Sequence, residues 1–332
     1  AAFGWNRGEI ARRARPTGGC SQRFGTIRHK AIMLAHNTKI SKAFDRGSMM
    51  RPAVWNNKIH VLGLVLLLVA SLANAADPAR METLTVGGTG SAMPLIGQFA
   101  QAYGSLEPNV KVRVVDPPLG SNGAIRAVLV GAVDLAVLGK PLTETEKAQG
   151  CQDWELGRTP FLVVTERKLP LPGFTVEQLA AIYSGKMTTW SDGSPIRLVV
   201  RNLFESDTLI LRKMSPDMDR AVDVALARPG MLVAANDLEN IDLLERTPDS
   251  LGTSNLALVQ AQNRKLNALP IDGKEPTLAA MRQGTYPYSK SIYLARGPKL
   301  SPVAQGFLEF ILSASGKEIL DRAGYVPAPS QP

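Results

Sequence analysis

Three loops rich in glycine, serine and threonine are the places where this chain could hold a ligand. Each follows a predicted strand and precedes a predicted helix, at residues 87–94, 120–123 and 201–208. Glycines let the backbone approach a ligand closely, and hydroxyls both donate and accept hydrogen bonds. Helix N-termini add free N–H groups and a positive dipole end. If the three loops converge with one arginine, these donors predict a site for an oxyanion.

The polar groups of the loops are hydroxyls, one amide, one carboxylate and one guanidinium. They are Thr89 and Ser91 in the first loop, Ser121 and Asn122 beside Gly123 in the second, and Arg201, Ser206, Asp207 and Thr208 in the third. A single loop of this kind is more often an ordinary helix N-cap. A single arginine is likewise more often the partner of a surface salt bridge. The prediction therefore depends on their order and common placement after strands.

The histidine and cysteine content argues against hydrolytic catalysis and metal binding. All three histidines, His29, His36 and His60, lie in the first 75 residues. The remaining chain lacks the base of a Ser-His-Asp or Cys-His site and the commonest transition-metal ligand. Beyond residue 75 there is a single cysteine, Cys151, and hence no CxxC zinc motif. We expect no metal, no cofactor and no enzymatic activity.

The positive charge of the chain belongs to its N-terminal segment. The 332 residues include 38 basic and 29 acidic side chains. Residues 1–75 hold 12 of the basic and two of the acidic ones, which leaves 26 and 27 beyond. The body therefore has no electrostatic footprint for nucleic acid or an anionic membrane, and we expect neither as a partner.

A secretory signal peptide is predicted at residues 49–75. Arg51 and Lys58 precede an apolar run at 61–72, and a small-residue cleavage sequence ends at Ala75. The run is shorter than the roughly 20 residues of a membrane-spanning helix, although an uncleaved anchor is the alternative. We expect cleavage after Ala75 and a periplasmic protein. Residues 1–48 are basic and aperiodic, and we interpret them as an upstream extension outside the working protein.

Short apolar runs alternate with helical patterns in the first half of the mature chain. Strands are predicted at 83–86, 110–115 and 135–138, and helices at 95–103, 124–130 and 144–149. This alternation predicts an α/β fold with a largely parallel sheet. Capping boxes at Thr143 with Glu146 and at Thr175 with Gln178 mark two helix starts, and Ser301 before a proline marks another.

Two segments carry a resemblance to a known family. Residues 174–193, FTVEQLAAIYSGKMTTWSDG, followed by PIRLVVR at 195–201, resemble the stretch ahead of the binding arginine in the phosphate-binding proteins of bacterial ABC phosphate importers. IDGKEPT at 271–277 with GTYPYS at 284–289 is a second match. The similarity extends over about 84–325.

The resemblance implies the two-lobed type 2 periplasmic-binding fold, in which two α/β lobes are joined by two crossover strands. Residues 160–165 and 286–294 are interpreted as those crossovers. Lobe one is then expected at 80–160 plus 286–332, and lobe two at 161–285. Closure of the lobes is expected to be a hinge motion that a ligand stabilises.

The resemblance also implies a dehydrated oxyanion held by hydroxyls, backbone N–H groups and one arginine, without a metal. The matching positions are Ser91 in the first loop, Ser121, Asn122 and Gly123 in the second, and Arg201, Ser206 and Thr208 in the third. Thr89, Lys140 and Asp207 are further candidates.

Two positions depart from the family pattern. The family ends a strand with a Ser-Asp pair whose carboxylate accepts the proton of hydrogen phosphate, whereas Gly139 stands in the aspartate's place here. In the third loop Asp207 replaces a glycine, and it either repels an anion or turns outward and caps the helix. Lys140 either adds a compensating charge or is merely solvated. Sulfate, a phosphonate, a phosphate ester or no small anion become alternatives to phosphate.

Three hypotheses about function follow. The first is an exported, monomeric solute-binding protein that captures phosphate or a related oxyanion for the membrane permease of an ABC importer. The second is the same fold with a degraded pocket, acting as a sensor or envelope interaction module. An enzyme is the weakest hypothesis, because Ser91 and Ser206 lack a base in any supporting motif.

Overall fold

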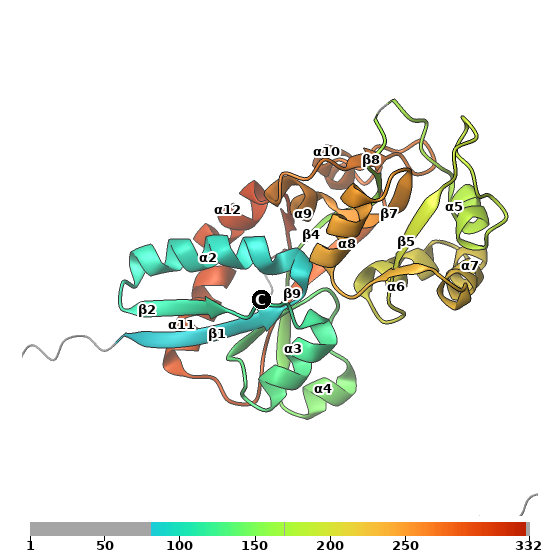
Figure 1. Ribbon diagram of the computed structural model, residues 1–332. Coiled ribbons are helices and arrows are strands. Elements are labelled where there is room, and N and C mark those ends of the chain that lie inside the picture. The colour runs from blue at the N-terminus through green and yellow to red at the C-terminus, as the bar shows by residue number, and fades with distance from the viewer. Residues whose placement is uncertain (1–80, 169, 330–332) are drawn as a thin grey trace, which may run out of the picture. The chain divides into compact units, whose positions relative to one another are not determined.

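The computed structural model describes residues 81–168 and 170–329 (Figure 1). The predicted upstream segment, residues 1–48, and the predicted signal peptide, residues 49–75, lie outside the described residues. Within the described part of the chain, no helix is both long and apolar enough to cross a lipid bilayer.

A ten-stranded mixed sheet forms the framework, in the order β2-β1-β3-β9-β4-β7-β5-β6, and β8 and β10 also pair with β4. The strands are β1 (Glu82–Gly88), β2 (Val110–Val114), β3 (Leu135–Leu138), β4 (Gln152–Thr165), β5 (Arg197–Arg201), β6 (Leu232–Ala234), β7 (Ser250–Asn255), β8 (Asn267–Leu269), β9 (Ser289–Arg296) and β10 (Val326–Pro327). β1 is parallel to β2 and β3, and β5 is parallel to β6 and β7. All pairings of β4 and β9 are antiparallel. The sheet is therefore parallel only in its two outer parts. The crossover strand β9 is antiparallel to β3, and the crossover strand β4 is antiparallel to β7.

Helices flank each outer group of strands. They are α2 (Met93–Leu106), α3 (Gly120–Leu129), α4 (Glu144–Ala148), α5 (Val176–Tyr183), α6 (Ser206–Met214), α7 (Pro216–Ala227), α8 (Asp237–Arg246), α9 (Leu256–Ala261), α10 (Leu278–Arg282), α11 (Pro302–Leu312) and α12 (Ala314–Arg322), with the short 3-10 helix η1 (Gly90–Ala92). α2, α3 and α11 lie near β1–β3, whereas α6 and α8 lie near β5 (Figure 1). Both predicted capping boxes are present, at Thr143 and Thr175, and Ser301 caps α11.

The apolar side chains pack in four clusters that divide into two pairs. One pair is built from residues 84–156 and 292–325 together with Ala257. The other pair is built from residues 161–286. We keep the predicted lobe bounds, 80–160 plus 286–332 and 161–285, as a working proposal for this two-lobed fold.

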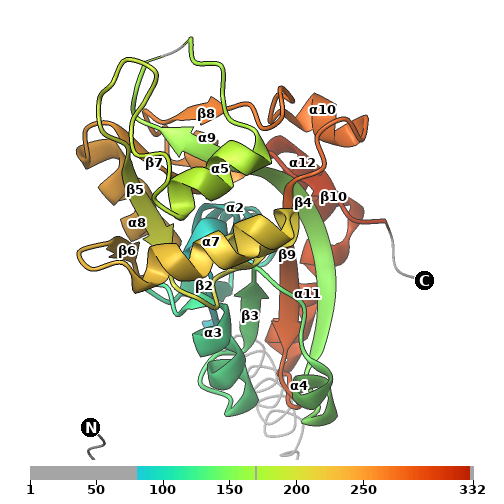
Figure 2. The same cartoon turned by 90° about the vertical axis from the view of Figure 1, so that its right-hand side faces the viewer.

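β4 and β9 connect the two groups of strands. They lie side by side over most of their length, with Gln152 opposite Arg296 and Pro160 opposite Ser289 (Figure 2). Beyond Pro160, β4 pairs instead with β7 and β8. A side chain on the inner face of β9 therefore lies where it can reach elements of both lobes, and Lys290 is such a residue.

Candidate functional site

The first loop lies at the end of β1 and is tied to its neighbour β3. Gly88 is the last residue of β1, and the amide of Thr89 donates to the carbonyl oxygen of Val137 at 2.9 Å. Thr89 and Ser91 are both buried, and their hydroxyl oxygens lie 3.2 Å apart. The structure thus brings two predicted ligand residues together in the interior.

A carboxylate that the sequence analysis did not include binds this loop. Asp237 is the first residue of α8, and its Oδ2 accepts the hydroxyl of Thr89 at 2.8 Å and the amide of Ser91 at 3.1 Å. The Nη2 atom of Arg201 lies 3.9 Å from the same oxygen. A hydroxyl, a backbone N–H and a guanidinium around one anionic oxygen are the groups predicted to hold an oxyanion.

A buried lysine completes the cluster. Lys290, on β9, donates to Oδ1 of Asp237 at 2.7 Å and to Oδ1 of Asp207 at 2.5 Å. The other oxygen of Asp207 accepts the hydroxyl of Thr253 at 3.1 Å. The Asp207 carboxylate therefore points inward, and of the two alternatives for this residue the outward cap does not occur. We call Arg201, Asp207, Asp237 and Lys290 the buried ion cluster.

Arg201 keeps two guanidinium nitrogens free within the interior. It is the last residue of β5, is 3% exposed, and donates through Nη2 to Glu205 at 2.9 Å. Among the described residues, neither its Nε nor its Nη1 has a hydrogen-bond partner. A buried donor without an acceptor is costly, so an arginine in this state indicates a site shaped around an anion.

Thr208 and Asn122 are placed less favourably for binding. The Thr208 hydroxyl donates to the carbonyl oxygens of Arg201 and Asn202, at 3.2 and 2.8 Å, so it serves the turn into α6. Asn122 is exposed on α3, which begins at Gly120, four residues earlier than predicted. Gly123 lies inside the same helix and is half-buried.

The second and third loops meet at Gly139. The amide of Gly139 donates to the hydroxyl of Ser121 at 2.9 Å. A Cβ atom added at Gly139 would lie 2.9 Å from the Ser206 hydroxyl oxygen and 3.7 Å from that of Ser121. A side chain at position 139 would therefore require the Ser206 side chain to rotate or shift.

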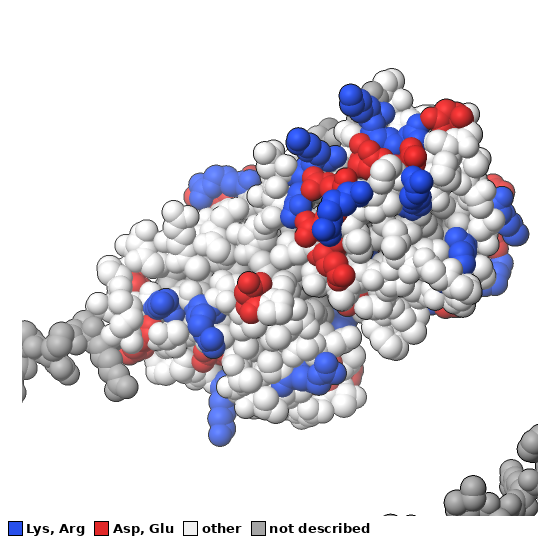
Figure 3. Space-filling view, viewed as in Figure 1, with Lys and Arg blue, Asp and Glu red and all other residues white. Residues whose placement is uncertain are grey.

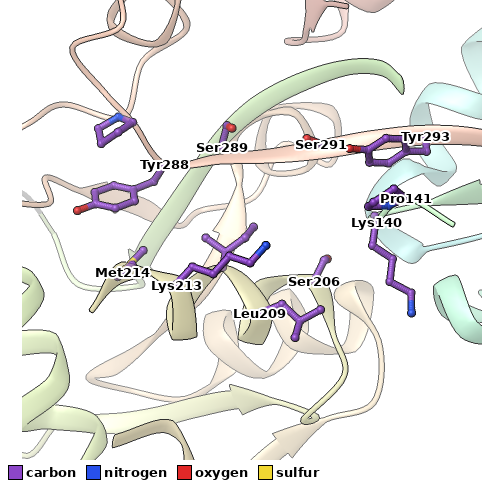
Figure 4. Close-up of a pocket in the computed structure, with 13 residues that line it drawn as sticks. Lys140, Pro141, Ser206, Leu209, Lys213, Met214, Tyr288, Ser289, Ser291 and Tyr293 are labelled. Atoms are coloured by element: carbon purple, nitrogen blue, oxygen red, sulfur yellow. The ribbon is translucent and has the colours of Figure 1, made fainter. Parts of the chain in front are cut away.

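A pocket of about 420 Å³ opens beside Gly139 and Ser206. Its walls come from the segment after β3, from α6 and from β9 with the residues before it: Gly139, Lys140, Pro141, Ser206, Leu209, Ile210, Lys213, Met214, Pro287, Tyr288, Ser289, Ser291 and Tyr293. Figure 4 shows the α6 residues across from Ser289 and Ser291 on β9, with Lys140 at one end. By contrast, the space lined by Thr89, Ser91 and Lys290 has no room even for a water molecule.

The charges of the buried ion cluster shift its pKa values in opposite directions. Burial disfavours the charged carboxyl of Asp237, but the charges of Lys290 and Arg201 outweigh it and hold the pKa of Asp237 well below its usual range. Burial also disfavours the Lys290 ammonium, but Asp207 and Asp237 outweigh it and raise the pKa of Lys290. Both groups therefore remain charged around neutral pH.

We expect the free energy of unfolding to decrease as the pH falls below about 4, the pKa of an aspartate in an unfolded chain. Asp237 takes up a proton less readily when folded, so its contribution is complete above that pKa and is lost as the pH falls through its folded value. Urea unfolding at a series of acidic pH values measures the slope. Asp237→Asn should flatten it, whereas Asp217→Asn, at an exposed ion pair on α7, should not. An unchanged slope in Asp237→Asn would contradict the assignment.

The described surface mixes both signs of charge. On the face shown in Figure 3, basic and acidic side chains are interspersed. Within residues 81–168 and 170–329, no group of three or more His, Cys, Asp or Glu side chains is placed to hold a metal ion.

Four residues that bind in this region were not predicted from the sequence: Glu205, Asp237, Thr253 and Lys290. Lys290 had a usable signal, because it shares the two-residue period of the buried Ile292 and Leu294 on β9. A charged residue on the buried face of a strand is rare unless it is paired. Asp237 had none, since an acidic residue in the first turn of a helix is ordinary.

Comparisons with known proteins agree with this architecture. The family model described as a PBP superfamily domain matches residues 73–315. The phosphate-binding protein PstS of Borreliella burgdorferi is 23% identical, over 80% of this chain and 98% of the relative. The PstS protein of Pseudomonas aeruginosa is 22% identical, over 79% of this chain and 91% of the relative.

Solved structures show the same fold. A chain from Clostridium perfringens, assigned to phosphate ABC transport and solved with bound phosphate, aligns with a TM-score of 0.64 and 19% identity, over 75% of this chain and all of that one. An ABC-type phosphate transport receptor from Vibrio cholerae aligns with a TM-score of 0.55 and 20% identity, over 74% of this chain and all of that one. The predicted fold class and the resemblance to phosphate-binding proteins are confirmed.

Proposed function

The chain belongs to the family of PBP superfamily domains, and from this premise we propose that it is an exported solute-binding protein that captures a phosphorus oxyanion for an ABC importer. The names of its curated relatives, phosphate-binding protein PstS, support this class of ligand. We further propose a periplasmic location, a membrane permease as partner, a monomer, and no catalytic step.

The pocket beside Gly139 carries the proposal about the ligand. Among the described residues that line it are two lysines, Lys140 and Lys213, and no Asp or Glu. Neither ammonium group is in a salt bridge with a described residue. Ser206, the first residue of α6, adds a polar side chain to the same lining. A pocket with positive charge and no acidic lining favours an anion.

The apolar part of the lining favours an anion that carries an organic group. Leu209, Ile210 and Met214 of α6 line the pocket together with its polar groups. A volume of about 420 Å³ lies within the usual range of small-molecule sites, which is roughly 300–1,000 Å³. Inorganic phosphate would fill only part of it. We therefore propose a phosphate ester or a phosphonate as the ligand, with Ser206, Lys140 and Lys213 as its polar contacts.

Calorimetry on residues 76–332 tests this proposal with four probes: inorganic phosphate, sulfate, methylphosphonate and glycerol phosphate. We expect the organic phosphorus anions to bind more tightly than phosphate or sulfate. Lys140→Ala and Lys213→Ala should each weaken binding by about 10- to 150-fold, since a hydrogen bond to a charged group contributes about 1.5–3 kcal/mol. Lys186→Ala, at an exposed lysine outside the pocket lining, serves as the matched control.

Arg201→Ala separates the pocket from the buried ion cluster. If inorganic phosphate binds most tightly and only Arg201→Ala abolishes binding, the ligand lies at the first loop and the proposed ligand class is wrong. If no probe binds to the folded protein, the proposal of oxyanion capture is wrong as a whole.

A second function is favoured by one observation, the carboxylate of Asp237 at the first loop. The Asp237 side chain fills the site at the first loop. This is expected of a protein that retains the fold but no longer binds free phosphate there. Such a protein would act as a sensor or an envelope interaction module. Absence of binding to all four probes, together with a stable envelope partner recovered by cross-linking, would favour this role over transport.

A further inference from the structure

The carboxylate of Asp237 has the surroundings of a bound anion rather than those of an ordinary helix-capping acid. It accepts a hydroxyl and an amide from the first loop and the ammonium of Lys290, and all of its partners come from other elements. The side chain is 7% exposed, and the amides of α8 are capped instead by Asn236. The Asp237 carboxylate is therefore not needed to begin its own helix.

The position of this carboxylate matches one part of the site predicted for the oxyanion, the part formed by the first loop and Arg201. Ser91 and Arg201 were predicted to bind the oxyanion, and Thr89 was a further candidate. These residues surround Oδ2 of Asp237 at 3.1, 3.9 and 2.8 Å. The space around them has no room for a second anion. An anion from solution and the Asp237 side chain are therefore mutually exclusive at the first loop.

We propose that Asp237 is an intramolecular ligand: the chain itself supplies the anion for a site built to take one from solution. The contact joins α8 to the first loop without any solute, so it holds the two lobes together in the absence of a ligand. It also makes the inner site unavailable to free phosphate. This inference stands apart from the pocket lined by Lys140, and it does not depend on what that pocket binds.

The charge balance defines the anion that could replace Asp237. The buried ion cluster and Glu205 together contain two cations and three carboxylates. Removal of the Asp237 carboxylate leaves two cations and two carboxylates. A small monoanion bound in its place restores the original net charge of these groups. A dianion would add a further negative charge to a dry interior, which is unfavourable. The vacated site should therefore accept acetate or formate and discriminate against sulfate.

Chemical rescue of Asp237→Ala tests the proposal. The variant should melt about 5–10 °C below wild type, because it loses one member of a buried ion network in a domain of this size. Acetate and formate should raise its melting temperature in a saturable way, as expected for ligands that bind only the folded state. Sulfate should do so less. Ionic strength is held constant with a bulky organic sulfonate.

Asp237→Asn is the matched control, because it removes the same charge but leaves the site filled. We expect acetate to raise the melting temperature of Asp237→Ala and to leave Asp237→Asn and wild type unchanged. An equal response in the two variants, or no response in Asp237→Ala, would overturn the proposal. If Asp237→Ala does not fold, the proposal is tested by the rate of hydrogen exchange at the Ser91 amide in Asp237→Asn. This exchange rate should be at least tenfold faster than in wild type, and an equal rate would overturn the proposal.

Discussion

Replacing Lys290 with methionine should lower the free energy of unfolding by about 3–5 kcal/mol. The Lys290 ammonium donates to Asp207 and to Asp237, and all three side chains are at least 93% buried. Methionine has similar length but no charge, so two carboxylates would be left in the interior without their shared cation. We expect the variant to be the least stable of the charge variants considered for this protein.

The loss exceeds that in Asp237→Ala for a structural reason. Removal of Asp237 leaves Lys290 paired with Asp207, and Arg201 paired with Glu205. Removal of Lys290 leaves no cation in hydrogen-bond contact with either Asp207 or Asp237 among the described residues. Breaking a buried pair from one side is costly because the remaining charge stays desolvated.

Urea unfolding at neutral pH measures the effect, with Lys186→Met as the control at an exposed lysine. The double variant Lys290→Met with Asp207→Asn should recover part of the loss, because it removes one of the two stranded charges. A Lys290→Met protein within about 1 kcal/mol of wild type would show that the buried ion cluster contributes little to stability, contrary to the usual cost of a broken buried pair.

Local patterns were sufficient to predict most of the framework. The alternation of apolar runs with helical periods placed β1–β3 and α2–α4, and the two capping boxes marked the starts of α4 and α5. These features depend on neighbours within about four residues, so the sequence alone determines them. The antiparallel crossover strands were different, because strand direction depends on partners far away along the chain.

The candidate site was predictable only in outline. The convergence of the first loop and Arg201 on a ligand stays a prediction, and in the structure both lie near one carboxylate oxygen of Asp237. The occupant of that site was not predictable, because Asp237 lies 146 residues from Ser91 and looks like any acidic residue in the first turn of a helix. From the sequence, Gly139 was interpreted only as the loss of the aspartate that accepts a proton from hydrogen phosphate. Its close approach to Ser206 depends on tertiary structure and could not be predicted from local sequence.

Gly88→Ala should unfold the protein or destabilise it by about 3 kcal/mol or more, a large effect for one added methyl group. Gly88 pairs with Val137 in the parallel ladder between β1 and β3. A Cβ atom at position 88 would lie 2.4 Å from the carbonyl oxygen of Val137 and 3.0 Å from its Cβ. Neither the backbone nor the buried side chain of Val137 can move far enough to make room for this methyl group. β1 and β3 must therefore separate at this point. The neighbouring amide of Thr89 would then lose its bond to Val137.

Gly97→Ala is the matched control and should change stability in the opposite direction. Gly97 lies exposed within α2, and apart from the local backbone of that helix no atom lies within 4 Å of a Cβ added there. Alanine in a helix interior should therefore stabilise the protein by about 0.5–1 kcal/mol. Denaturant unfolding of both variants measures the contrast. Equal stability of the two would mean that β3 does not fix the end of β1, and therefore does not position the first loop against Asp237. Opposite effects would show that the close approach of β1 to β3 at Gly88 is required for a stable fold.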